Sequence, residues 1–197
     1  MSSAVRGSAT VRSGHGDIRL EGVEGSVDAH TGHGDLRIEA RGGAVTLNTG
    51  HGDLSIVGHE LDSLSAKTGN GDLHAELRGA AGTIQLRTGN GDISLTAGDA
   101  DRILAHAGRG DLSGRIEGTV SGEVKLDTGH GEIALSLGAD VPFTVDASTG
   151  AGEVTSRLDL ADVERSKDGR RLRGSHLGGG SPVLLRSANG DIYIRTR

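Results

Sequence analysis

The chain has 197 residues, a formal net charge of −6 and almost no aromatic side chains, with one Phe, one Tyr and no Trp. Acidic and basic residues are interspersed, so the charge gives no reason to expect nucleic acid as a partner. The sequence has no cysteine, which excludes disulfides, thiolate nucleophiles and cysteine-ligated metals. Hydrophobic residues make up 34% of the chain, so we expect a core of small and branched aliphatic side chains in thin layers, as in a repeat protein.

The N-terminal segment, 1–7, has no apolar signal-peptide core, and no apolar run in the chain approaches about 18 residues. We therefore expect no transmembrane segment and, for the sequence as written, a cytoplasmic protein. The alternative is an envelope or surface domain cut from a longer, anchored protein.

One motif recurs along the chain, Thr-Gly-x-Gly-Asp followed by alternating apolar residues, as at 31–38 and 49–56. Its second glycine recurs every 18 to 21 residues, and the last step is 38 residues. These structural turn glycines are Gly16, Gly34, Gly52, Gly71, Gly91, Gly110, Gly131, Gly152 and Gly190. A fixed period near 20 residues is the signature of a repeat architecture.

Each period contains two segments in which polar and apolar residues alternate, such as 35–39 and 44–49. Such alternation predicts half-buried β-strands, and the glycines between them supply the positive φ that tight turns need. If each period is one coil of a parallel β-solenoid, its apolar residues stack on those of the next coil. Stacking then supplies the core that no single coil can make.

We therefore predict an all-β, single-domain parallel β-solenoid over 1–197, with about nine coils of 18–21 residues, two short strands per coil and a right-handed path. Regular coils cover 8–156, an irregular coil with a charged loop covers 157–182, and 183–197 forms the strand that closes the stack. An antiparallel β-sandwich is the competing fold. We favour the solenoid because hairpins do not require an identical turn at every second connection.

The two ends of this predicted stack differ. The first coil, 4–12, is poorly capped, as a joining surface would be, so end-to-end self-association is one expected mode of assembly. The arginines and Tyr193 of the last strand, 191–197, would discourage such pairing at the other end.

The repeated Thr-Gly-x-Gly-Asp-Leu/Ile-x-Leu/Ile motif resembles the bacterial "putative adhesin" family of β-strand-repeat domains, also grouped with the toastrack domains. The resemblance covers nearly the whole chain, including the glycine-rich connection 177–180 and the last motif at 189–194. It implies a parallel β-helix domain of the kind found in bacterial surface and envelope-stress proteins and in soluble intracellular ones. The molecular activity of that family is undefined, so the resemblance brings no catalytic residues and no cofactor.

The acid after each turn forms a column in the predicted stack, where carboxylates one coil apart repel. A bound cation would relieve that repulsion, and oxygen ligands suit Ca²⁺. The candidate ligands are Asp35, Asp53, Asp72 and Asp92. The favoured alternative is that each carboxylate accepts backbone N–H groups of its own turn or pairs with a neighbouring Arg or Lys.

Two further columns follow from the motif. His15, His33 and His51 have the chemistry to ligate Zn²⁺, Ni²⁺ or Cu²⁺, but Asn, Arg and Ala fill the same place farther along, which is typical of a polar turn position. We therefore predict no metal site there. The motif threonines are predicted to face inward and to pair with each other on neighbouring strands.

A basic cluster in the irregular coil is the one strong departure from mixed charge. It consists of Arg165, Lys167, Arg170, Arg171 and Arg173. Such a cluster is suited to docking an acidic protein, a phosphate or a membrane surface. Three acids nearby, at 162, 164 and 168, dilute it, so a solvated loop is the alternative.

These observations predict a non-enzymatic scaffold or adhesin-like binding module that presents rigid faces to an unknown protein or cell-envelope partner. A Ca²⁺-stabilised repeat of a surface protein is the alternative, and a carbohydrate-active β-helix enzyme comes third. Catalysis is disfavoured because the acids follow the repeat and no nucleophile and base are brought together. Sugar sites usually add stacking aromatic rings, and the one Tyr of this chain lies in the terminal strand.

Overall fold

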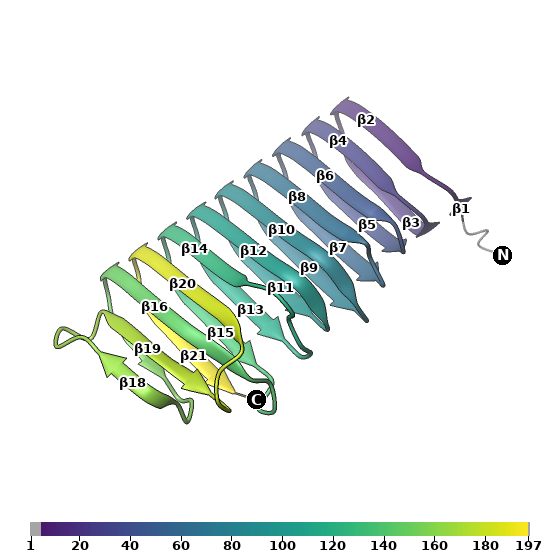
Figure 1. The fold of residues 1–197 in the computed structure, drawn as a ribbon. Helices are drawn as coiled ribbons and strands as arrows, with labels where there is room; N and C mark the ends of the chain where they lie inside the picture. The colour runs from purple at the N-terminus through teal and green to yellow at the C-terminus, as the bar shows by residue number, and fades with distance from the viewer. Residues whose placement is uncertain (1–4, 197) are drawn as a thin grey trace.

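The computed structural model describes residues 5–196 and consists of two long β-sheets that face each other along an extended stack (Figure 1). In spatial order, sheet A contains β1 (Val5–Arg6), β3 (Ile18–Glu24), β5 (Leu36–Arg41), β7 (Leu54–His59), β9 (Leu73–Arg78), β11 (Ile93–Ala97), β13 (Leu112–Ile116), β15 (Ile133–Leu137), β21 (Ile192–Thr196) and β17 (Val154–Ser156). Sheet B contains β18 (Ala161–Arg165), β19 (Arg171–His176), β16 (Phe143–Ala151), β20 (Ser181–Asn189), β14 (Val124–His130), β12 (Ala100–Arg109), β10 (Ala81–Asn90), β8 (Ser63–Asn70), β6 (Ala44–His51), β4 (Val27–His33) and β2 (Ala9–His15).

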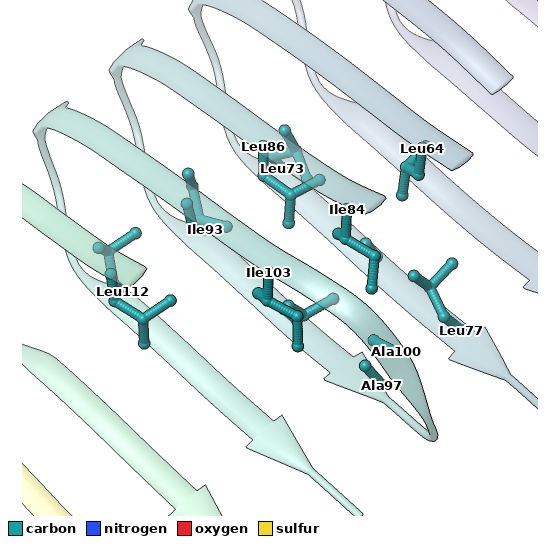
Figure 2. Packing of buried hydrophobic residues seen from close by; sticks show 14 of the residues in the cluster. Leu64, Leu73, Leu77, Ile84, Leu86, Ile93, Ala97, Ala100, Ile103 and Leu112 are labelled. Carbon is teal, nitrogen blue, oxygen red and sulfur yellow. The ribbon is translucent and has the colours of Figure 1, made fainter. Parts of the chain in front are cut away.

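Each coil gives one strand to each sheet, and parallel pairing stacks equivalent residues of successive coils in columns. Ile84 of β10, for example, lies between Leu64 of β8 and Ile103 of β12, and each is at most 1% exposed. Figure 2 shows such side chains filling the space between the two sheets. The predicted all-β parallel solenoid with inward apolar columns is therefore confirmed. Its right-handed path stays a prediction.

The order of the layers differs from the prediction at the C-terminal end. Seven coils follow in chain order, from β2–β3 to β14–β15, but the next layer in space is β20–β21, and β16–β17 lies beyond it (Figure 1). β20 pairs in parallel with both β14 and β16, and β21 pairs with both β15 and β17. The expectation of about nine successive coils, closed by a strand at 183–197, was therefore wrong. That segment forms two strands inside the stack.

The irregular coil is an antiparallel hairpin, β18–β19, which extends sheet B beyond β16. Leu172 of β19 is fully buried and continues the apolar column of Ala147 in β16. His176 stacks on Phe143, with ring centroids 5.0 Å apart. The outer strand β18 is exposed throughout. Its register shift between Ala161 and Glu164 and its charged side chains protect this sheet edge from further pairing.

His176 also ties the hairpin to the loops on either side of β16 and β17. Its Nε2 lies 2.9 Å from the carbonyl oxygen of Ala139, and its Nδ1 lies 3.0 Å from that of Asp159. Both nitrogens can donate only when the ring is protonated. The carbonyl of Ala139, followed by that of Asp159, accordingly raises the pKa of His176.

The opposite end of the stack is formed by β2 in sheet B and by the short strand β1, which covers part of β3 in sheet A. The coil expected at 4–12 begins outside the described residues. Its described part contributes Ala9 and Val11, which are partly buried against the core. Among the residues that the structure describes, β2 pairs with β4 alone.

Candidate functional site

The motif threonines are buried, as predicted, but their hydroxyl groups do not pair with each other. Each donates a hydrogen bond to the backbone carbonyl of the second turn glycine in the preceding layer. Thr68 Oγ1 lies 3.0 Å from Gly52 O, and Thr88 Oγ1 lies 3.0 Å from Gly71 O. Thr31, Thr49, Thr128, Thr149 and Ser187 do the same. The threonine therefore satisfies a carbonyl that the tight turn would otherwise leave without a partner.

The glycines of the motif let the turns of successive layers lie directly on one another, although Ala188 takes the first place in the last motif. The nine second glycines have φ between 110° and 147°, where a side chain is strained. A Cβ atom on Gly52 would also lie 2.2 Å from the carbonyl oxygen of Gly34. The first glycine is constrained by space alone, since a Cβ on Gly50 would lie 2.6 Å from the carbonyl oxygen of Gly32.

The acids of the motif form a hydrogen-bonded ladder along the turn edge. Asp35 Oδ1 accepts the backbone N–H of Asp53 at 2.8 Å, and Asp53 Oδ1 accepts that of Asp72 at 2.8 Å. The same contact joins Asp17 to Asp35, Asp72 to Asp92, Asp92 to Asp111, Asp111 to Glu132 and Asp191 to Glu153. The donor is thus the acid of the next layer and not, as the favoured alternative had it, a group of the same turn.

This ladder occupies one oxygen of each candidate cation ligand, Asp35, Asp53, Asp72 and Asp92. Within residues 5–196, no three His, Asp or Glu side chains are grouped so that they could hold a metal ion. The cation site proposed from the sequence therefore gains no geometric support. The carboxylates instead stabilise the turn backbone.

The histidine column is a stack of parallel rings. The ring centroids of His15 and His33 are 5.0 Å apart, and those of His33 and His51 are 4.9 Å apart, with interplanar angles of 4° and 15°. The stack continues into amides, since Asn70 Nδ2 lies 3.1 Å from His51 Nδ1 and Asn90 Nδ2 donates to Asn70 Oδ1 at 2.8 Å. Parallel rings point their nitrogen lone pairs in parallel, whereas a metal needs them to converge at about 2 Å.

The basic cluster lies on the hairpin, and the structure divides it. Arg173 forms a hydrogen-bonded ion pair with Asp146 of β16, at 2.9 Å and 3.0 Å, which raises the pKa of Arg173. Arg171 lies 4.0 Å from the same carboxylate, and Arg170 lies 4.0 Å from Asp168. Three of the five cations are therefore tied to neighbouring acids.

The other two, Arg165 and Lys167, are exposed, and neither forms an ion pair with any residue in the described part of the chain. The same segment displays two large apolar side chains, Val163 of β18, which is 47% exposed, and Leu177 at the exit of β19, which is 60% exposed. The hairpin thus combines free cations with exposed apolar surface.

Comparison with known proteins identifies the fold family. A family profile described as Toastrack DUF4097 matches residues 42–195. The chain belongs to the Toastrack DUF4097 family. This match confirms the family resemblance inferred from the repeated motif, and the seven coils and interchanged layers described above are how this toastrack domain is built. The described part of the domain contains no helix long and apolar enough to cross a membrane.

Two further comparisons add little about the activity of this toastrack domain. No curated protein matches its sequence. Among solved structures, one match is a "putative cell adhesion protein" from Clostridium sporogenes. The match spans 96% of this chain and 92% of the other chain, with a TM-score of 0.30 and 10% sequence identity. A TM-score and an identity this low transfer no function from one protein to the other.

Proposed function

We propose that this toastrack domain is a non-enzymatic scaffold that presents rigid outer faces, and above all the hairpin β18–β19, to a protein or cell-envelope partner. The observation that carries the proposal is the contrast between the repeat and the hairpin. In the repeat, the motif hydroxyls and carboxylates bind the backbone of adjacent layers. The hairpin instead leaves Arg165, Lys167 and Val163 exposed.

Rigidity supports the scaffold part of the proposal. Every motif turn is tied to its neighbours by a hydroxyl–carbonyl bond, a carboxylate–amide bond or both, in addition to the pairing of the strands. The parts of a repeat protein that do not build its core are free to vary and commonly carry binding. The hairpin is the largest such departure here.

The chemistry of the hairpin fits a partner with an acidic surface. Two free cations speed association with a surface of opposite charge and make it sensitive to salt, while Val163 adds apolar area that burial would stabilise. Asp162 and Glu164 on the same strand lower the net charge, so this surface differs from the uniformly basic surface that a nucleic acid requires.

Binding of the labelled domain to envelope and cytosolic fractions of cells that naturally produce it would test the proposal. We expect the double variant Arg165→Ala plus Lys167→Ala to lose most binding. Arg37→Ala plus Arg87→Ala removes the same charge from exposed positions of the regular coils and should bind as the unchanged domain does. Equal binding by both variants would contradict a function for the hairpin. Binding to the cytosolic fraction would favour the cytoplasmic location expected from the sequence, and binding to the envelope fraction would favour the alternative, an envelope or surface domain.

End-to-end association remains part of the proposal, because the N-terminal edge of sheet B is the regular strand β2, whereas the opposite edge is the shifted, charged strand β18. Light scattering during size-exclusion chromatography tests it. We expect the domain to be a dimer that becomes a monomer on Thr10→Lys, because this substitution places a charge on the edge of β2. A concentration-independent monomer would contradict it.

A further inference from the structure

A hollow of about 320 Å³ lies on the outer face of sheet A, where the interchanged layers meet. It spans β15, β21 and β17, three strands that are neighbours only because the last coil lies inside the stack (Figure 1). The backbone at Leu135 and Ile194 forms its floor. The side chains around it are Ala134, Thr155, Arg157, Tyr193 and Arg195.

Tyr193 stands between two small residues in register, Ala134 on β15 and Thr155 on β17. Tyr193 is 42% exposed, and its hydroxyl donates to Asp191 Oδ2 at 3.1 Å, which fixes the ring orientation. The hydrogen bond and the charge of Asp191 raise the pKa of Tyr193, so the hydroxyl stays neutral. The phenol ring is therefore an uncharged wall of the hollow, and the charges of Asp191, Glu132 and Glu153 lie near it at the motif turns.

Two arginines also line the hollow. Arg195 Nε donates to Ser136 Oγ at 2.8 Å, which holds that side chain against β15. Arg157 follows β17 directly, and its backbone N–H donates to Ile194 O at 2.9 Å, which sets it beside Arg195. In the described chain, neither guanidinium forms an ion pair, whereas Arg19 and Arg78 on the same sheet pair with Glu21 and Glu76.

Unpaired guanidinium groups on the wall of one hollow are suited to an anion that accepts parallel N–H bonds, as a carboxylate does. An aromatic ring next to them suits a ligand with an apolar face, such as the C–H face of a sugar ring. The volume lies at the lower end of the range for ligand sites, which is about 300–1,000 Å³. It therefore admits one small ring or one unit of a polymer.

We propose that this hollow binds the carboxylate-bearing sugar unit of an acidic polysaccharide, with Arg157 and Arg195 on the carboxylate and Tyr193 against the ring. The site binds without cleaving, because the carboxylate that touches Tyr193, Asp191, accepts the Glu153 N–H with Oδ1 and the Tyr193 hydroxyl with Oδ2 and so has no proton for a leaving oxygen. This inference goes beyond the hairpin proposal and is independent of it, since the two surfaces lie on different sheets.

Isothermal titration calorimetry with polygalacturonate tests the inference. Galacturonate monomer shows whether a single sugar unit is enough for binding. Dextran is the neutral control polymer, and dextran sulfate is the sulfated one. We expect the polyuronate to bind, the monomer to bind more weakly, and both controls to bind at least about tenfold more weakly. Arg157→Gln should weaken polyuronate binding about tenfold or more through the loss of one charge-assisted contact, and Tyr193→Ser by a similar factor through the loss of the aromatic contact with the sugar ring. Arg37→Gln, on the outer face of the same sheet far from the hollow, should leave it unchanged.

Three outcomes would overturn the inference. One is the absence of polyuronate binding. Another is equal binding of dextran sulfate, which would mean general attraction of anions. The third is an equal loss in the Arg37→Gln control. Thermal unfolding of each variant identifies any that fail to fold, and Tyr193→Leu, which keeps apolar area but not the ring or the hydroxyl, then serves as the second variant and should also lose binding.

Discussion

Ala107 occupies, in the sixth coil, the place that threonine fills in most others. It is fully buried and pairs in register with Thr88 on one side and Thr128 on the other. Both of these donate a hydroxyl to a turn carbonyl one layer back, at 3.0 Å. For the coil between them, the equivalent carbonyl belongs to Gly91. We therefore predict that Ala107→Thr adds the missing hydrogen bond to Gly91 and stabilises the fold.

The expected gain follows from the neighbouring layers. A buried hydrogen bond contributes about 0.5–1.5 kcal/mol net, and the added methyl group contributes about 0.8 kcal/mol by burial. Immobilising the side chain and tight packing oppose these terms by about 1 kcal/mol. Since Thr88 and Thr128 already fit the same column, we expect a net gain of about 1 kcal/mol, or about 2–4 °C in Tm for a chain of this size.

The matched control is Ala107→Val, which has the shape of threonine but no hydroxyl. Urea unfolding followed by circular dichroism gives the free energy of unfolding of both variants. We expect threonine to exceed valine, because the second methyl group of valine replaces the hydroxyl and covers the Gly91 carbonyl without giving it a donor, which offsets the about 0.8 kcal/mol that burial of this methyl contributes. A valine variant as stable as the threonine variant would refute the account of the motif threonine.

Glu132→Asp should raise Tm by about 1–2 °C by extending the carboxylate ladder to the backbone N–H of Asp191, and an unchanged Tm would argue against the ladder. Gly52→Ala, with φ 138° and a backbone clash, should cost about 3 kcal/mol or more in urea unfolding, against about 1 kcal/mol for Gly42→Ala, with φ 66° and open space. The backbone carbonyls facing His176 raise its pKa, so its stabilisation is complete below the ordinary value near 6.5 and falls as pH rises through the raised value. The domain should therefore lose stability relative to His176→Gln as the pH rises above about 6.5, and equal pH profiles would contradict this.

The architecture was predictable because its determinants are local. Alternation within 35–39 and 44–49 assigns Leu36, Ile38 and Leu47 to the core, and each is at most 1% exposed in the structure. Glycine at a fixed spacing likewise marks turns that need positive φ. Both signals lie within one period, so the sequence alone carries them.

The vertical contacts between layers were not predictable in the same way. Asp53 accepts the N–H of Asp72, a residue 19 positions away. This contact depends on how far one turn is offset from the next. A period in the sequence does not specify that offset. One signal was nevertheless present, since an acid as short as aspartate occupies the column in every layer from Asp17 to Asp111.

The interchange of the last layers escaped prediction for a different reason. The motifs at 149–154 and 187–194 carry equivalent inward columns, so either can stack on β14–β15 with little difference in buried apolar area. What distinguishes them is the hairpin between them, which is joined to β16 by antiparallel pairing and by the Arg173–Asp146 ion pair. That pairing occupies the far edge of β16 and leaves its near edge for β20. The order of the layers is thus determined by a contact outside the repeat.

The same interchange has a consequence for how the domain holds its C-terminal end. β21 lies between β15 and β17, and β20 lies between β14 and β16, so the last coil has parallel partners on both sides. A terminal segment tied on one side frays easily, whereas releasing this one requires two sets of strand pairing to break together. The interchange therefore places Tyr193 and Arg195 on a strand held from both sides, and a hollow built on such a strand keeps the geometry that binding requires.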